Sequence, residues 1–85
     1  MRVRVQLFAV ARQRAGRSVV EVEVPGGSTV ADLKAALRDQ VPDLAPVLPT
    51  ARFALDAEYA DDATPIPPGA DVALIPPVSG GSGGL

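Results

Sequence analysis

Residues 28–42 read STVADLKAALRDQVP, and this segment decides the fold because it is the one strong helical pattern among short strands. Its apolar side chains recur at helical spacing, which predicts a helix with one buried face. Ser28 or Thr29 can cap the first turn, where Asp32 suits the positive end of the helix dipole. Pro42 cannot continue the helix and ends it. The apolar positions are Val30, Leu33, Ala36, Leu37 and Val41.

Two strand-like segments precede this helix. MRVRVQLFAV (1–10) and SVVEVEV (18–24) alternate apolar and polar residues, a period that is typical of strands with one buried face. Between them, ARQRAG (11–16) is rich in helix formers and ends in glycine, which favours a short turn of helix. Pro25-Gly26-Gly27 ends the second strand. The positions that share one face of each strand are Val3, Val5, Leu7, Val20, Val22 and Val24.

A proline-rich connector and three short strands follow the helix. PDLAPVLPT (42–50) contains three prolines, so it cannot form one continuous helix. RFALD (52–56) and EYA (58–60) are predicted to pair with each other. DVALIPP (71–77) is predicted as the last strand, which stops at its prolines because they lack the amide hydrogen that a ladder needs.

This order of elements predicts an α+β domain with one main helix packed on one face of a mixed sheet. If the first and last strands are parallel neighbours, the segment that carries the helix crosses over between them. That architecture is the β-grasp, or ubiquitin-like, fold. We expect it to span residues 1–78, followed by a flexible Gly/Ser tail over residues 79–85.

The chain of 85 residues contains neither cysteine nor histidine, and its net charge is -2. It therefore lacks a thiolate nucleophile, the commonest general base near neutral pH and the usual soft metal ligands, so we expect no metal or cofactor of its own. The basic residues are not clustered, which argues against binding to nucleic acid. We also expect no membrane span and no signal peptide, and hence a cytoplasmic location.

The chain closes with IPPVSGGSGGL (75–85). A Gly/Ser tail is often only a linker or an unstructured end. Here the glycines follow a stiff Pro-Pro-Val segment, which projects them from the sheet edge. Because glycine has no Cβ atom, such a tail can enter a narrow enzyme channel. A terminal glycine carboxylate can then be activated as an acyl-adenylate, and this chemistry needs no Cys or His from the chain.

The chain resembles the family of small, sulfur-carrying subunits of molybdopterin synthase in four segments, which are VQLFAVAR (5–12), GGSTVADLKAAL (26–37), FALDAEYADDATPI (53–66) and VALIPPVSGG (72–81). The resemblance runs through residues 2–81. Its most specific part is the Pro-Pro-Val-Ser-Gly-Gly ending, since Gly-Gly alone indicates only a ubiquitin-like protein. It implies a β-grasp fold whose working group is the C-terminal diglycine.

The resemblance also implies a series of steps at that diglycine. A partner similar to ubiquitin-activating (E1-like) enzymes uses ATP to adenylate the last glycine, and a sulfur donor protein then supplies the sulfur of a C-terminal thiocarboxylate. The tail enters the large subunit of the synthase, where the sulfur passes to cyclic pyranopterin monophosphate in molybdenum cofactor biosynthesis. The chain would thus be the non-catalytic, sulfur-donating subunit of a heteromeric sulfurtransferase.

Carried onto this sequence, the resemblance places the thiocarboxylate on Gly81, directly after Gly80, which has no side chain. It further implies three kinds of partner contact, which are an extended segment bound by both partners, an apolar surface and one basic position. Phe8 can instead be a core aromatic residue, and Arg12 a solvated charge. The residues implied to contact the partners are Phe8, Arg12, Ile75, Pro76, Pro77, Val78 and Ser79.

The residues after Gly81 depart from the family, which ends at the first Gly-Gly, whereas this chain continues with Ser82-Gly83-Gly84-Leu85. The Leu85 side chain should not pass a channel shaped for glycine. The three additional residues from Gly81 to Gly84 extend the reach of the tail by roughly 10 Å. Trimming after Gly81, trimming of Leu85 alone so that Gly84 is terminal, and a fusion remnant that blocks the tail all stay open. The spacing from Pro-Pro favours Gly81.

Other functions also stay open. A sulfur carrier for another pathway, such as thiazole formation for thiamine, shares the fold and the diglycine. A ubiquitin-like modifier is joined to lysines, but Lys34 is the only lysine here, which disfavours polymer chains. A plain binding module with an inert tail is a further alternative. Four acidic residues can steer a basic partner, although a polar hairpin tip is the simpler interpretation. They are Asp56, Glu58, Asp61 and Asp62.

Overall fold

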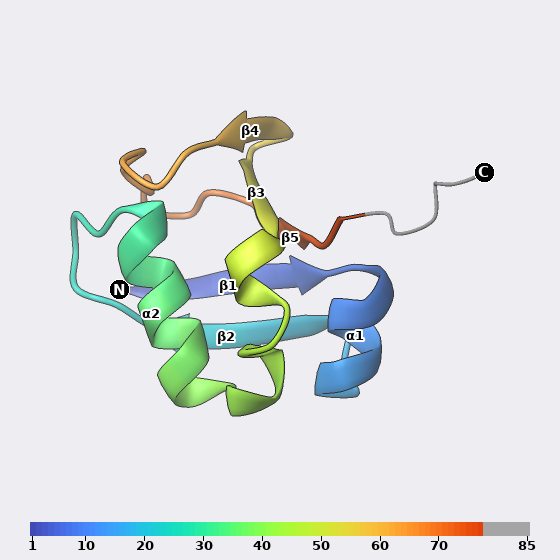
Figure 1. Ribbon diagram of the computed structural model, residues 1–85. Coiled ribbons are helices and arrows are strands. Elements are labelled where there is room, and N and C mark those ends of the chain that lie inside the picture. Colours follow the sequence, from blue (N-terminus) through green and yellow to red (C-terminus); the bar gives the residue numbers. More distant parts are fainter. Residues whose placement is uncertain (78–85) are drawn as a thin grey trace.

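A computed structural model of the chain describes residues 1–77 (Figure 1). Five strands form one sheet in the order β2-β1-β5-β3-β4, accompanied by two α-helices and two 3₁₀ turns. In chain order the elements are β1 (Arg2–Leu7), α1 (Ala9–Ala15), β2 (Val19–Glu23), α2 (Val30–Gln40), the 3₁₀ turns Pro42–Leu44 and Leu48–Thr50, β3 (Arg52–Leu55), β4 (Glu58–Ala60) and β5 (Val72–Ile75). The domain boundary predicted at residue 78 lies just outside the described residues and stays a prediction.

The two central strands, β1 and β5, are parallel, whereas the other neighbouring pairs are antiparallel. Val5 lies opposite Val72, and Leu7 lies opposite Leu74. Parallel neighbours cannot be joined by a tight turn, so the segment that carries α2 crosses over between them. Figure 1 shows α2 lying across one face of the sheet. The predicted α+β mixed sheet of the β-grasp type is therefore confirmed.

Helix α2 begins at one of the two predicted caps, Thr29. Its Oγ1 accepts a hydrogen bond from the Asp32 N–H at 3.4 Å, and Asp32 Oδ2 accepts one from the Thr29 N–H at 2.9 Å. This reciprocal capping box satisfies two backbone donors at the helix start. Ser28 has a different role, because its buried hydroxyl donates to the Pro25 carbonyl oxygen at 2.6 Å.

The hydrophobic core lies between α2 and the sheet and is almost entirely aliphatic. Leu33 and Leu37 of α2 belong to the same buried cluster as Val5 and Leu74 of the central strands. Full burial of such a side chain stabilises the fold by about 1.5–3 kcal/mol, so these positions hold the helix on the sheet. The largest fully buried side chains are Val5, Val20, Val22, Val30, Leu33, Leu37, Leu44, Leu48, Phe53, Val72 and Leu74.

Both helices are short. Helix α1 confirms the predicted helical turn and ends at Gly16, whose φ of 71° is the left-handed conformation that glycine adopts freely. The Gly16 N–H donates to the Arg12 carbonyl oxygen at 2.9 Å and closes the helix. Within residues 1–77, neither helix has the length and apolar character needed to cross a membrane.

The turn between β3 and β4 places two non-glycine residues in a conformation that favours glycine. Asp56 and Ala57 have φ values of 50° and 70°, and Leu55 pairs directly with Glu58 across them. A two-residue hairpin turn with both φ values positive is typically Asn-Gly or Asp-Gly. We expect Ala57→Gly to stabilise the protein by about 0.5–1 kcal/mol, measured by urea unfolding.

The matched control for this turn is Ala35→Gly, at an exposed position inside α2. It is expected to destabilise the protein by about 1 kcal/mol, because glycine costs that much in a helix interior. If both substitutions shifted the urea midpoint in the same direction, the left-handed conformation of Ala57 would be contradicted.

A candidate partner-binding face beside the tail exit

Strand β5 brings the chain to the end of the sheet where α1 begins (Figure 1). Because β1 and β5 are parallel, both strands end on the same side of the domain. β1 continues through Phe8 into α1, and β5 continues into Pro76, which is buried, and Pro77, which is exposed. The remaining predicted tail residues lie outside the described residues, so their roles stay predictions. They are Val78, Ser79, Gly80 and Gly81.

Phe8 and Ile75 leave neighbouring strands at matching positions. The register pairs Leu7 with Leu74, and one further step places Phe8 beside Ile75. Phe8 is 45% exposed, so the alternative that it is a core aromatic residue is wrong. Ile75 is half-buried and lies on the face of β5 opposite to Leu74. The structure therefore places the two predicted apolar contact residues at the same end of neighbouring strands.

Strand alternation explains why Phe8 points outward. In β1 the even-numbered residues Arg2, Arg4 and Gln6 are exposed and the odd-numbered ones are buried. Phe8 continues the exposed row, and the chain then turns sharply at Ala9, whose φ is 53°. This left-handed conformation costs an alanine about 1–2 kcal/mol, so the rest of the fold must hold it. The turn starts α1 directly after the exposed aromatic ring.

Arg12 lines the same shallow groove as Phe8. The groove has a volume of about 250 Å³, and Arg12 is exposed at its side, on α1. Among residues 1–77 Arg12 forms no ion pair, in contrast to Arg2 and Arg4. The predicted basic position beside Phe8 is thus present and unpaired in the described part of the chain.

Tyr59 is a large exposed residue that the sequence interpretation did not single out. It is 65% exposed and pairs with Ala54 of β3, which in turn pairs with Ala73 of β5. Residues directly opposite on neighbouring strands share one face of a sheet. The Arg52 guanidinium lies over the Tyr59 ring, 5.2 Å from its centroid, which is a cation–π geometry. We call the outer face the apolar part of the sheet opposite α2, formed by Phe8, Ala54, Tyr59, Ala73 and Ile75.

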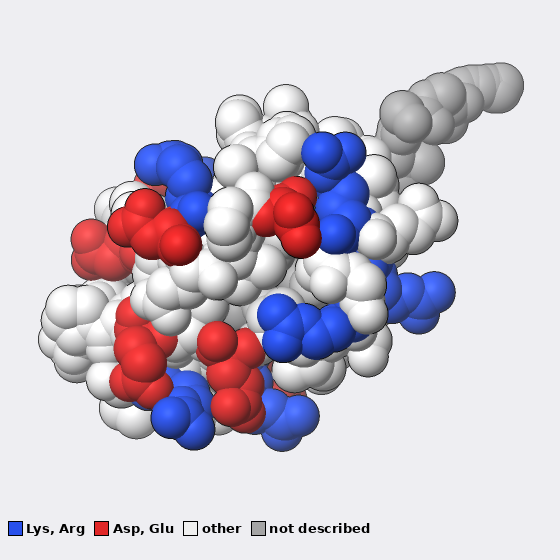
Figure 2. Space-filling view, turned by 90° about the horizontal axis from the view of Figure 1, so that it is seen from below, with Lys and Arg blue, Asp and Glu red and all other residues white. Residues whose placement is uncertain are grey.

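Charged pairs cover the opposite end of the same side of the sheet. Arg2 Nε lies 2.8 Å from Glu23 Oε2, and Arg4 Nε lies 3.6 Å from Glu21 Oε2. Figure 2 shows acidic and basic side chains interspersed over much of the view from below, with basic ones predominating at the right-hand end, where Figure 1 places α1. The ion pairs therefore neutralise the end of this side of the sheet that is farthest from Phe8.

The hydrogen bond from Arg2 lowers the pKa of Glu23, and the same bond raises the pKa of Arg2. A carboxylate with a lowered pKa stabilises the fold above its unfolded pKa, about 4.3, and this contribution is lost as the pH falls through the folded value. We expect Glu23→Gln to be less stable than the parent chain at pH 7 and equally stable at about pH 2 in urea unfolding. Arg2→Gln should behave in the same way, and a pH-independent loss in both variants would contradict the ion pair.

The four acidic residues near the β3–β4 turn mostly serve local structure. Asp56 Oδ1 accepts a hydrogen bond from the Asp71 N–H at 3.0 Å, and Asp62 Oδ1 lies 2.6 Å from Lys34 Nζ. Asp61 accepts from the Ala63 N–H at 3.0 Å. In the part of the chain that the structure describes, no three His, Cys, Asp or Glu residues are arranged to hold a metal ion. The interpretation as a polar hairpin tip is therefore favoured.

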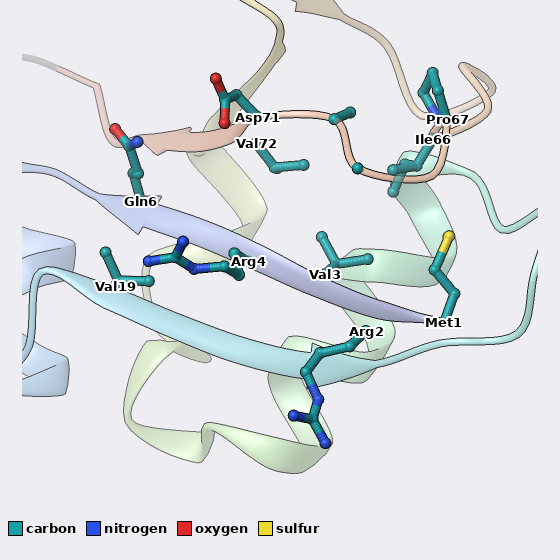
Figure 3. Close-up of a pocket in the computed structure, with 12 residues that line it drawn as sticks. Met1, Arg2, Val3, Arg4, Gln6, Val19, Ile66, Pro67, Asp71 and Val72 are labelled. Atoms are coloured by element: carbon teal, nitrogen blue, oxygen red, sulfur yellow. The ribbon is translucent and has the colours of Figure 1, made fainter.

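A second groove, of about 250 Å³, lies between the start of β1 and the segment that precedes β5 (Figure 3). Met1 and Arg4 line one side of it, and Ile66, Pro67 and Asp71 line the other. The groove runs along β1 as far as Gln6 and Val19, which also line the groove beside Phe8. None of the predicted site residues within residues 1–77 borders it.

Comparisons with known proteins agree with this fold. The chain is 37% identical over 83 residues to the molybdopterin synthase sulfur carrier subunit of Chlamydomonas reinhardtii. The match covers 95% of this chain and 100% of that protein. The crystal structure of H. volcanii small archaeal modifier protein 1 has a TM-score of 0.80 and 29% identity, covering 91% of this chain and 98% of that one.

A third similar protein is found in an assembly. A chain of the protein–protein complex of subunits 1 and 2 of molybdopterin-converting factor from Helicobacter pylori matches with a TM-score of 0.69 and 25% identity, covering 94% of this chain and 99% of that one. The model of the ThiS family matches residues 5–81, a range that includes the outer face, Pro76-Pro77 and Gly80-Gly81. Because this match spans most of the sequence, the chain belongs to the ThiS family.

Proposed function

We propose that this protein is the sulfur carrier subunit of a molybdopterin synthase, with Gly81 as the residue that carries the sulfur. The observation that carries the proposal is the family match through residues 5–81, which reaches the diglycine. It is supported by the 37% identity to an algal protein with that name over its entire length. The absence of Cys and His is consistent with this role, because the reacting group is a main-chain carboxylate.

In this proposal the described domain presents the tail and the partner supplies the chemistry. An E1-like enzyme binds ATP and adenylates the terminal carboxylate, and a sulfur nucleophile from a donor protein displaces AMP to leave a thiocarboxylate. The chain itself binds neither ATP nor a metal. The buried Pro76 fixes the point at which the chain leaves the sheet, and Pro77 keeps Pro76, the residue before it, extended.

The outer face is the surface that we assign to the large subunit of the synthase. Ile75 directly precedes Pro76-Pro77 and Phe8 follows the neighbouring strand, so a partner that receives the tail would also cover this end of the face. The similar H. pylori chain is found in a complex of subunits 1 and 2, which supports a partner of that kind. Phe8 and Ile75 would lie nearest the tail, Tyr59 would extend the contact toward the sheet edge, and Arg12 would pair with an acidic group at the rim.

Intact-mass measurement tests the carrier function directly. The protein ending at Gly81 is incubated with ATP, its activating enzyme and a sulfur donor, and the expected product has sulfur in place of one terminal oxygen. Adding the large subunit and the pyranopterin substrate should return the carboxylate and yield molybdopterin. A thiocarboxylate that forms but is consumed only by a thiazole-forming enzyme would reassign the carrier to thiamine biosynthesis. No adenylate at all would contradict the proposal.

A second candidate function is protein modification, in which the activated glycine is joined to amines of other proteins. The observation that favours it is the fold similarity to H. volcanii small archaeal modifier protein 1, at 29% identity. Both functions begin with the same adenylate and differ in the acceptor. Mass spectrometry of cell extract digests separates them, because only a modifier leaves residues of its C-terminus on target lysines.

A further inference from the structure

Side-chain amines are nearly absent from this chain. Seven of its eight basic residues are arginines, and Lys34 is the only lysine. A guanidinium stays protonated at physiological pH and is not an acyl acceptor, whereas a lysine amine can be one. Lys34 is therefore the only side chain of this protein that could accept an acyl group as an amide.

The structure holds the Lys34 amine in a groove between α2 and β3–β4. Its Nζ lies 2.6 Å from Asp62 Oδ1 and 5.9 Å from the centroid of the Phe53 ring, and the side chain is 23% exposed. Phe53, Ala60 and Asp62 line the same groove. The Lys34 side chain therefore lies along the groove, and its nitrogen is held against Asp62, whose own side chain is 65% exposed.

The carboxylate that pairs with Lys34 is itself anchored to α2. The Asp62 carbonyl oxygen accepts the Ala31 N–H at 3.0 Å, and the neighbouring Thr64 carbonyl oxygen accepts the Val30 N–H at 3.0 Å. Both donors belong to the first turn of the helix that carries Lys34. The two partners of the ion pair are thus held by the same backbone connection, unlike a typical surface pair of two mobile side chains.

We infer that Lys34 is withheld from acylation, so that the activated C-terminus passes only to acceptors outside this protein. This inference rests on the proposed activation of the glycine. In the excluded reaction a lysine amine attacks the carbonyl carbon of the acyl-adenylate and a C–N bond forms. The C–O bond to AMP breaks, and AMP leaves with the electron pair. The amine proton goes to solvent. The amine would have to leave Asp62 and the groove to enter the active site of the activating enzyme, and the anchored ion pair opposes this movement. The carrier therefore neither conjugates to a second copy nor forms chains through a lysine.

The experiment compares Lys34 with a lysine introduced by Arg38→Lys, at an exposed position one turn along α2. The full chain is treated with N-hydroxysulfosuccinimide acetate, and the acetylation rate of each lysine is read by peptide mass spectrometry. We expect Lys34 to react at least about fivefold more slowly than the introduced lysine, and Asp62→Ala to raise its rate about three- to fivefold. Asp39→Ala, an exposed acidic residue of the same helix, should leave the rate of Lys34 unchanged.

This labelling requires no activating enzyme, so its outcome is independent of the proposed function. Equal rates at the two lysines within about twofold, or no effect of Asp62→Ala, would overturn the inference even if the thiocarboxylate forms. In a second arm with ATP and the activating enzyme, the parent chain should give no self-conjugate and Arg38→Lys should give one. A conjugate of the parent chain at Lys34 would also overturn it, whereas failure to form any adenylate would count against the proposed function alone.

Discussion

A chain that ends at Gly81 is expected to form the acyl-adenylate and thiocarboxylate at least about a hundredfold faster than a chain that ends at Leu85, because a misplacement of only 1 Å can cost that much in rate. The four residues Ser82 to Leu85 would move the reacting carboxylate roughly 13 Å beyond its place in the activating enzyme. The measurement is the rate of pyrophosphate release, followed by intact mass. A chain that ends at Gly84 serves as the intermediate case.

Adding a single methyl group at Gly81 tests the same assignment without changing the length of the chain. Gly81→Ala, in the protein that ends at residue 81, is expected to lose most of its sulfur transfer, because a Cβ atom must then fit a channel shaped for glycine. Its urea unfolding curve should match that of the parent, since every core residue lies between Val3 and Leu74. Equal activity of the chains ending at Gly81 and Leu85 would place the reacting group elsewhere and contradict the assignment.

The fold could be predicted from the sequence because its elements are locally encoded. The alternation in β1 and β2 and the helical spacing in α2 each identify a buried face within a few residues, and the structure confirms all three. The choice between Ser28 and Thr29 as the cap could not be made from sequence. Both side chains can accept the required hydrogen bond. The tight turn in which the Ser28 hydroxyl donates to the Pro25 carbonyl oxygen exists only in the folded chain.

The candidate site was only partly predictable, because the missing part depends on strand pairing. Phe8 and Ile75 could be identified through the family resemblance, but nothing in the sequence shows that they are neighbours until the β1–β5 register is known. Tyr59 was missed for the same reason, since its face follows from its pairing with Ala54. The register between β3 and β4 would have identified Tyr59 as a residue of the outer face. The Lys34–Asp62 pair joins residues 28 positions apart, which local patterns do not reveal.

Charge placed on the outer face is expected to separate binding from folding. Phe8→Glu should weaken binding of the synthase large subunit about a hundredfold, because it buries an unpaired carboxylate where the partner covers the tail exit. Tyr59→Glu should weaken binding about tenfold, since Tyr59 lies toward the sheet edge and is therefore nearer the rim of the contact. Titration calorimetry with the purified large subunit measures both, and the parent urea midpoint should be retained because neither side chain belongs to the buried core.

The matched control for this surface is Ala35→Glu, which adds the same charge to the exposed side of α2 on the opposite face of the domain. It should change the dissociation constant by less than about twofold, because surface substitutions away from a contact have little effect. The comparison is decisive because all three variants carry the same added charge, so a general electrostatic effect would weaken them equally. If Ala35→Glu weakened binding as strongly as Phe8→Glu, the partner would lie over the helix, and the outer face would have to be abandoned as the docking surface.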